Sequence, residues 1–212
     1  CLIALLGAIP RAALAADLPA GDCKRPAART DLSACDWSRA KLAGKDLRGA
    51  RFAGARMENA DFRKARLDEA DFRGSNLKWS NFSKANLKAA DFRNADLFHA
   101  IFDDADVSDG RFGGANLFGA NLINTRAVRA DFAGAQLKDI LMEGIDLSGG
   151  SMRGCYAFRG VFSGARLVGT DLSGADLTGA AAENADFSGA RLVGTKLPGA
   201  TLRFAVFKDA DM

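Results

Sequence analysis

The sequence has little of several residue types on which common protein classes depend. Its 212 residues include four prolines, one histidine, one tyrosine and two tryptophans. The formal net charge is only +3, from 29 basic and 26 acidic residues, so bulk charge indicates neither nucleic-acid binding nor an acidic imitation of a nucleic acid. Apolar residues make up 48% of the chain and recur at regular positions, which excludes a disordered protein.

The residues that carry chemistry are also sparse. The single histidine, His99, stands between Phe98 and Ala100, and we interpret it as a solvated surface residue. The cysteines lie far apart without histidine partners, which argues against a metal site. Glycines recur every five residues and do not form the glycine-rich loop that holds phosphates. We therefore expect no enzyme, no catalytic residue, no metal and no cofactor.

The first residues, CLIALLGAIPRAALAA, differ from the rest of the chain. An apolar run over residues 2–9 precedes the small residues Ala13 and Ala15, which is typical of a secretory signal and too short for a membrane span. We predict a signal peptide over residues 1–16 that is cleaved, a periplasmic or secreted protein, and no transmembrane segment in the mature chain. The alternative is a disordered or packed leader.

The cysteines near the start of the mature chain are candidates for a disulfide. An exported chain enters an oxidising compartment, where Cys23 and Cys35 would bridge and pin the N-terminal end; the alternative is two free thiols. We expect residues 17–30 to form an N-terminal cap. Cys155 occupies a position otherwise held by small residues, which indicates a buried filler.

From residue 31 to residue 212 the chain repeats every five residues. The segment ADFRGSNLKWSNFSKANL, residues 70–87, shows the pattern: a small residue, then Asp or Asn, then Leu or Phe, then two variable positions. Neither an α-helix nor a straight strand keeps the large apolar residue on one face at this period, because five residues turn a helix by about 500° and an odd step reverses a strand. We expect a short extended piece and one corner per repeat, with Gly or Asn at the corner position that needs a positive φ.

The alternation of Phe with Leu predicts how many corners close one coil. Phe52, Phe72, Phe92, Phe112 and Phe132 are separated by twenty residues. A coil of four repeats stacks Phe on Phe and Leu on Leu, whereas a coil of three would stack Phe on Leu throughout. We therefore predict four sides, with weaker support after Phe132, where the alternation fades.

This pattern resembles the pentapeptide-repeat family, whose motif is A-(D/N)-L-x-x, over residues 30–212. The resemblance implies an all-β solenoid: a right-handed quadrilateral β-helix with four pentapeptides per coil and about nine coils. It implies a solid interior of side chains. It also makes a homodimer through the C-terminal coil plausible, because the family includes such dimers.

One outward strip of apolar residues is a candidate surface for a protein partner. At twenty residues per coil, Phe98, Phe118 and Phe158 share a corner column interrupted by Lys138, and Trp79 lies near its N-terminal end. The neighbouring column holds three further apolar residues: Ile101, Leu141 and Val161. The alternatives are scattered surface residues, or a strip covered by residues 17–30.

Nucleic-acid functions are less well supported. Some pentapeptide-repeat proteins imitate duplex DNA, bind type II topoisomerases and protect them from quinolones, which requires a strongly negative surface. A basic face could instead bind nucleic acid directly, but acidic residues are interspersed with its members: Arg63, Lys64, Arg66, Arg73, Lys84, Lys88 and Arg93. The sequence thus favours a non-catalytic exported scaffold or interaction rod with an unidentified protein partner, and the alternative is a cytoplasmic DNA mimic.

Overall fold

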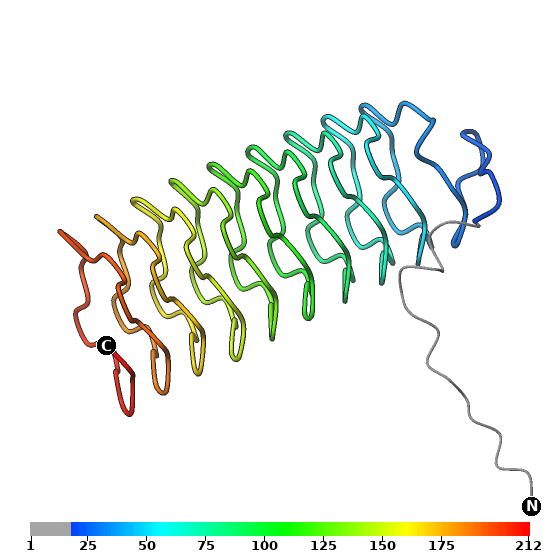
Figure 1. Ribbon diagram of the computed structural model, residues 1–212. Coiled ribbons are helices and arrows are strands. Elements are labelled where there is room, and N and C mark those ends of the chain that lie inside the picture. Colours follow the sequence, from blue (N-terminus) through cyan, green and yellow to red (C-terminus); the bar gives the residue numbers. More distant parts are fainter. Residues whose placement is uncertain (1–17) are drawn as a thin grey trace, which may run out of the picture.

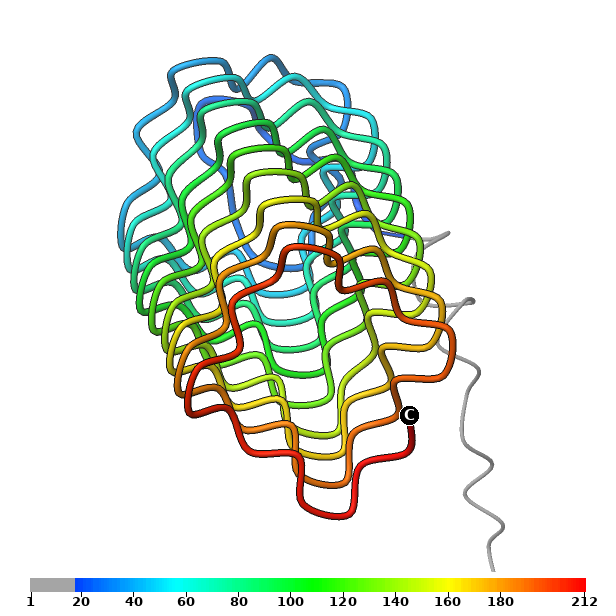
Figure 2. The ribbon, with the colours of Figure 1, turned by 90° about the vertical axis from the view of Figure 1, so that its left-hand side faces the viewer.

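The computed structural model describes residues 18–212, and the predicted signal peptide lies outside the described residues. The chain winds into a rod of stacked coils that runs from its N-terminal to its C-terminal end (Figure 1). Seen nearly along the axis of the rod, successive coils follow the same closed outline (Figure 2). Within the described residues no α-helix is found, and each side of a coil contributes a single bridge residue instead of a longer strand.

Parallel bridges set the length of one coil. Asp31 pairs with Arg51, Arg51 with Asp71 and Asp71 with Asp91, and the same spacing of twenty residues continues to Asp211. Since each repeat has five residues, one coil has four sides, as the stacking of like residues predicts. Neighbouring coils are joined as in a parallel sheet: the Phe52 N–H donates to the Asp71 carbonyl oxygen at 2.7 Å, and the Asp71 N–H donates to Ala50 at 3.0 Å.

The corners have the predicted backbone. From Arg39 onward, the second residue after each large apolar position has a positive φ, for example 72° at Gly54 and 58° at Asn59. The N–H of Ala55 donates to the carbonyl oxygen of Phe52 at 3.0 Å, which closes a turn with the positive φ at its third residue, as a type II turn requires.

The interior is filled by the large apolar residue of each repeat and by the small residue two positions before it. The rings of Phe72 and Phe92 stack at 4.8 Å and those of Phe92 and Phe112 at 4.9 Å, while Phe82 meets Phe92 edge to face at 5.7 Å. These rings are completely buried, which confirms the predicted column. Cys155 is buried as a filler, and this burial raises the pKa of its thiol to about 12.

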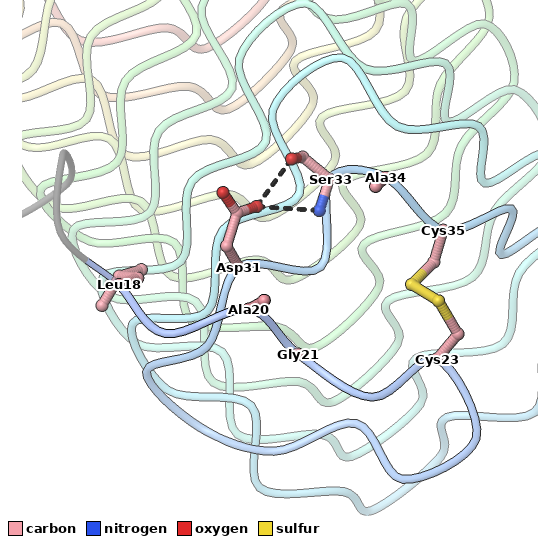
Figure 3. A pocket seen from close by; sticks show the side chains of 8 residues that line it. All are labelled: Leu18, Ala20, Gly21, Cys23, Asp31, Ser33, Ala34 and Cys35. Carbon is pink, nitrogen blue, oxygen red and sulfur yellow. Dashed lines mark hydrogen bonds between the residues drawn. A yellow bond between two sulfur atoms is a disulfide. The ribbon is translucent and has the colours of Figure 1, made fainter.

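At the N-terminal end, residues 19–25 form a short loop beside the first coil. Gly21 donates to the Asp31 carbonyl oxygen at 2.7 Å, and Cys23 and Cys35 are paired with their Cα atoms 5.7 Å apart (Figure 3). A Cβ on Gly21 would collide with Leu32, so the loop lies directly against the first buried side chain. The indole N–H of Trp37 donates to the Leu32 carbonyl oxygen at 3.0 Å, and both residues are buried.

Candidate functional site: an aromatic ridge beside an uncharged side

The structure brings the four predicted aromatic residues into one row along a corner of the rod, which we call the aromatic ridge. Its members are Trp79, Phe98, His99, Phe118, Lys138, Tyr156, Phe158 and Arg159. They come from the two corner positions that follow one side of each coil, except Tyr156, which is the outward residue of that side. The coil length of twenty residues places them one above another.

The N-terminal part of the ridge is a packed cluster. Phe98 stacks on Phe118 with ring centroids 5.4 Å apart, and Trp79 meets Phe98 edge to face at 5.5 Å. Trp79 keeps 52% of its surface exposed, so the cluster is open to a partner. Trp79 also has a φ of 59°, a left-handed conformation that costs a bulky residue about 1–2 kcal/mol.

Sequence reasoning missed the part that His99 takes in this cluster. His99 is a half-buried surface residue whose imidazole stacks on the Trp79 indole at 4.3 Å and meets the Phe98 ring edge to face at 4.3 Å, contacts that the sequence analysis did not predict. The imidazole lies over Gly119, where any side chain would collide with it. The twenty-residue spacing of Trp79 and His99 was the signal that could have identified the pair.

In the C-terminal part of the ridge, basic side chains lie over aromatic rings. Lys138 lies over the Phe118 ring at 5.6 Å, and the Arg159 guanidinium lies over Phe158 at 5.4 Å. Arg159 also pairs with Asp139 at 2.7 Å, and Tyr156 stacks on Phe158 at 6.1 Å. Tyr156 and Arg159 were not among the predicted contact residues, because they belong to different repeat positions from the phenylalanines.

The other predicted apolar residues lie on the next side of the rod. Ile101, Leu141 and Val161 are half-buried outward residues of that side. Ile101 and Leu141 are separated by one coil, in which Asn121 forms a bridge to each of them, and Val161 pairs with Leu141 in the next coil. The N-terminal segment does not cover them over the residues described: Arg29 donates to Arg48 and Thr30 accepts from Arg51, which places that segment at the first coil. The alternative of a strip covered by residues 18–30 is therefore wrong.

The basic residues that suggested a nucleic-acid surface are mostly engaged with carboxylates. Arg73 holds Asp71 with two bonds, from Nε to Oδ1 at 2.8 Å and from Nη2 to Oδ2 at 2.7 Å, and Arg63 holds Asp61 in the same way. Further pairs join neighbouring coils: Arg66 with Asp46, Lys84 with Asp104, and Lys88 with Asp106. Such pairs leave little net charge for a phosphate backbone.

Within residues 18–212, the chemical groups do not assemble into a metal centre, since no three histidine, cysteine or carboxylate side chains come together. No helix over the same residues has the length and apolar character needed to cross a bilayer. The ring contacts of His99 are with Trp79, Phe98 and Phe118. What the ridge offers is contact area, and exposed aromatic rings are the residues that most often anchor protein partners.

Comparison with known proteins identifies the repeat. The sequence matches the description of a pentapeptide repeat region over residues 45–122, and that of pentapeptide repeats (8 copies) over residues 111–149, 161–192 and 185–212. No protein of curated function matches it.

Several solved structures are similar to this chain. HetL, a pentapeptide repeat protein involved in heterocyst differentiation regulation from the cyanobacterium Nostoc sp. strain PCC 7120, is 30% identical, with 81% of this chain and 86% of HetL covered and a TM-score of 0.46. A pentapeptide repeat protein from the Arabidopsis thaliana thylakoid lumen is 35% identical over 47% of this chain and 69% of its own length, with a TM-score of 0.46. QnrB1, a plasmid-mediated fluoroquinolone resistance protein, is 22% identical over 74% of this chain and 89% of its own, with a TM-score of 0.40. The matched repeats and the identity to HetL over most of both chains show that this chain belongs to the pentapeptide-repeat family.

Proposed function

We propose that the protein is a non-catalytic rod, a right-handed quadrilateral β-helix of about nine coils, that binds a protein partner through the aromatic ridge. The observation that carries the proposal is the ring cluster in which the exposed Trp79 packs against the half-buried Phe98 and Phe98 stacks on the half-buried Phe118. A partner that covers these rings would remove their apolar surface from water, which favours binding. In the rod alone, part of this surface stays in contact with water.

The large side chain of Trp79 supports the same conclusion, because the backbone at its corner does not require one. At the equivalent corner position of later coils the chain places Gly179 and Gly199, which adopt a positive φ of 69° and 67° without steric cost. Other side chains also hold this corner with a positive φ, for example Arg39 and Asp139, so what distinguishes Trp79 is a large, exposed ring at a position where glycine suffices.

A binding experiment tests this proposal. Phe98, Phe118 and Phe158 are replaced together by serine, a residue that the same corner column already carries at Ser38. Affinity capture from the native periplasm, read by mass spectrometry, should recover a partner with the wild type and lose it with the triple variant. A matched control replaces Ala53, Ala133 and Val193, which hold the equivalent position of another corner, by serine. Equal recovery by all three proteins would contradict the proposal.

Export is part of the proposal. The apolar leader of residues 1–16, a cap over residues 17–30 and a disulfide between Cys23 and Cys35 fit a protein of the periplasm or the exterior. Cell fractionation with intact mass measurement would test it: we expect a cleaved chain that is two mass units lighter before reduction. An uncleaved product in the cytoplasm would contradict export.

A homodimer through the C-terminal coil is also proposed. Phe204 is 70% exposed and Val206 is 48% exposed, and Leu202 and Phe207 beside them are only partly buried. Sedimentation velocity of the wild type and of the Val206→Asp variant would test it, since the variant should be monomeric where the wild type is dimeric.

The second candidate is a cytoplasmic DNA mimic that binds a type II topoisomerase, a function known for some members of the pentapeptide-repeat family. The net charge of +3 and the arginines that neutralise surface aspartates speak against it. A gyrase supercoiling assay separates the two candidates: protection or inhibition at submicromolar protein would favour the mimic.

A further inference from the structure

One side of the rod carries no charge over successive coils. We call it the uncharged side, and its outward residues are Asn81, Ile101, Asn121, Leu141, Val161, Ala181 and Thr201. Each of the other three sides places charged residues within the same span, for example Asp91, Arg111 and Asp131 on one of them. Because all sides share the same backbone geometry, the difference does not come from the fold.

The uncharged side has two unlike borders. The aromatic ridge follows one edge, since its corner residues immediately precede this side in the chain. The opposite edge carries four acidic residues, which we call the acidic flank: Asp103, Asp104, Glu143 and Glu183. The corner that holds the acidic flank has no lysine or arginine between residues 103 and 202.

The acidic flank is only partly neutralised within the rod. Lys84 lies 3.9 Å from Asp104 at the N-terminal margin, and Glu183 accepts a hydrogen bond from the Ser163 hydroxyl at 3.0 Å. Burial, with a contribution from the neighbouring Asp104 charge, raises the pKa of Asp103. A cation brought to this edge by a partner would therefore find favourable electrostatic complementarity.

The backbone of the uncharged side is closed to an added strand. The Leu141 N–H donates to Ala120 at 3.0 Å, and the Leu141 carbonyl oxygen accepts from Leu122 at 2.7 Å. Ile101 is bonded in the same manner, to Ser80 and Phe82. A partner that binds by adding a strand needs unpaired backbone groups on the rod, and here they are already paired. The partner must therefore satisfy its backbone hydrogen bonds within itself, as an α-helix does.

We propose that the uncharged side docks an amphipathic α-helix of a protein partner, lying along the axis of the rod with an apolar stripe and one flank of Lys or Arg. The stripe would cover Ile101, Leu141 and Val161, and the cations would face the acidic flank. At about 4.8 Å per coil, the distance from the coil of Ile101 to that of Ala181 is about 19 Å. This length corresponds to a helix of about 13 residues. The inference rests on the proposed function, because it names the kind of partner that the same surface binds.

Synthetic helices test the proposal on the full chain. Two peptides of about 18 residues, long enough to be helical, would share one leucine stripe and carry either lysine or glutamate along one flank. By fluorescence anisotropy at low salt, we expect the lysine peptide to bind the wild type at least about tenfold more tightly than the glutamate peptide, with the preference reduced at high salt.

Two variants with the same change in net charge locate the binding. The acidic-flank variant carries Asp103→Asn, Asp104→Asn, Glu143→Gln and Glu183→Gln. The control variant removes four acids from another corner: Asp68→Asn, Glu69→Gln, Asp109→Asn and Asp209→Asn. We expect the acidic-flank variant to lose about tenfold in affinity for the lysine peptide and the control to lose less than about twofold. Thermal unfolding of both variants verifies that they are folded.

Each other outcome overturns the inference. Equal binding of both peptides, no binding of either, or equal losses in both variants would show that the acidic flank does not select a cationic helix. A lysine peptide kept extended by prolines that binds as tightly as the helical one would show that the partner is not a helix. If the triple serine variant of the ridge loses the native partner while the acidic-flank variant keeps it, the proposed function stands and this inference fails.

Discussion

Two regions of the rod reach the same fold with different side chains. Residues 51–132, which we call the aromatic coils, stack phenylalanines in two columns, with ring distances of 4.8 Å for Phe62 with Phe82 and 4.5 Å for Phe112 with Phe132. Residues 136–192, the mixed coils, place Met152, Leu172 and Ala182 at the same interior positions. The interior is equally buried in both regions, so the fold requires a filled volume in each coil more than any particular residue.

The outer surfaces of the two regions also differ, in the residue that binds the aspartate before each corner. In the aromatic coils, Asp71 and Asp91 are held by the arginine two residues later, through two bonds each. In the mixed coils a serine takes that position, and the Ser148 N–H and hydroxyl both donate to Asp146, at 3.1 and 2.6 Å. Both arrangements satisfy the aspartate before the corner, and only the arginine brings a compensating charge.

The largest effect is expected from breaking the ring column. Phe92→Ala should lower the free energy of unfolding by about 3–5 kcal/mol, because it removes contacts with both Phe72 and Phe112 and leaves a cavity between stacked coils. Leu172→Ala on the same side of the mixed coils should cost less, at the lower end of the range for leucine of about 2–5 kcal/mol. Denaturant unfolding measures both, and a larger loss for Leu172→Ala would show that the ring column is not specially stabilising.

A second test concerns a place where large and small residues have exchanged positions. Ile140 occupies a small-residue position, and its neighbours Ala157 and Gly160 are small where the aromatic coils have a leucine and an alanine. A Cβ on Gly160 would lie 3.2 Å from Ile140 Cγ2 and 2.7 Å from the Phe162 ring. Gly160→Ala should therefore cost about 1–3 kcal/mol through overpacking.

The matched control for this exchange is a double-mutant cycle. Ile140→Ala removes one of the three atoms that the new methyl group meets, so the double variant should be less destabilised than the sum of the single variants, by about 0.5–3 kcal/mol. Strict additivity in denaturant unfolding would show that Ile140 and Gly160 do not compensate one another.

Much of this architecture could be predicted from the sequence. The pattern repeats every five residues and residues twenty positions apart are alike, which gives the number of sides in one coil. The column of Phe52 to Phe132 and the positive φ of the corners followed from it and are confirmed. The exchange at Ile140 could not be predicted, since it depends on which side chains of two coils meet inside the rod. The stacking of His99 on Trp79 was not predicted because the apolar column was built from the first residue after each large apolar position, whereas Trp79 and His99 occupy the second.

A smaller effect is expected at the exposed ridge. Trp79→Gly relieves a left-handed φ of 59° and loses the stack on His99, so the two changes should nearly cancel and leave the free energy of unfolding within about 1 kcal/mol of the wild type. The mixed coils already hold glycine at this corner, at Gly179. A loss of more than about 2 kcal/mol in denaturant unfolding would mean that the tryptophan stabilises the rod instead of serving a partner.

Acid should lower the free energy of unfolding through the surface aspartates of both regions, over the same range of pH. Hydrogen bonds from Arg63 lower the pKa of Asp61, and hydrogen bonds from Ser188 lower that of Asp186. Since these pKa values are lower in the folded than in the unfolded chain, their contribution is complete above about pH 4 and disappears as the pH falls through the folded values. For Asp46, held by Arg48, the folded value is about 2. Urea unfolding between pH 2 and pH 5 measures this, and a stability that rises as the pH falls would contradict it.

The smallest effect is expected from exchanging the arginine of the aromatic coils for the serine of the mixed coils, which tests whether charge distinguishes the two surfaces. Arg73→Ser converts a corner of the aromatic coils into the arrangement seen at Ser148, and should change the free energy of unfolding by less than about 1 kcal/mol at low salt, because the pair is exposed. At about 1 M salt, where the Debye length is about 3 Å, the difference should vanish. The reverse variant, Ser148→Arg, should gain a salt-dependent contribution of the same size. If Arg73→Ser costs the same at both salt concentrations, the arginine acts through packing of its aliphatic stem, and the two surfaces differ in contact area and not in charge.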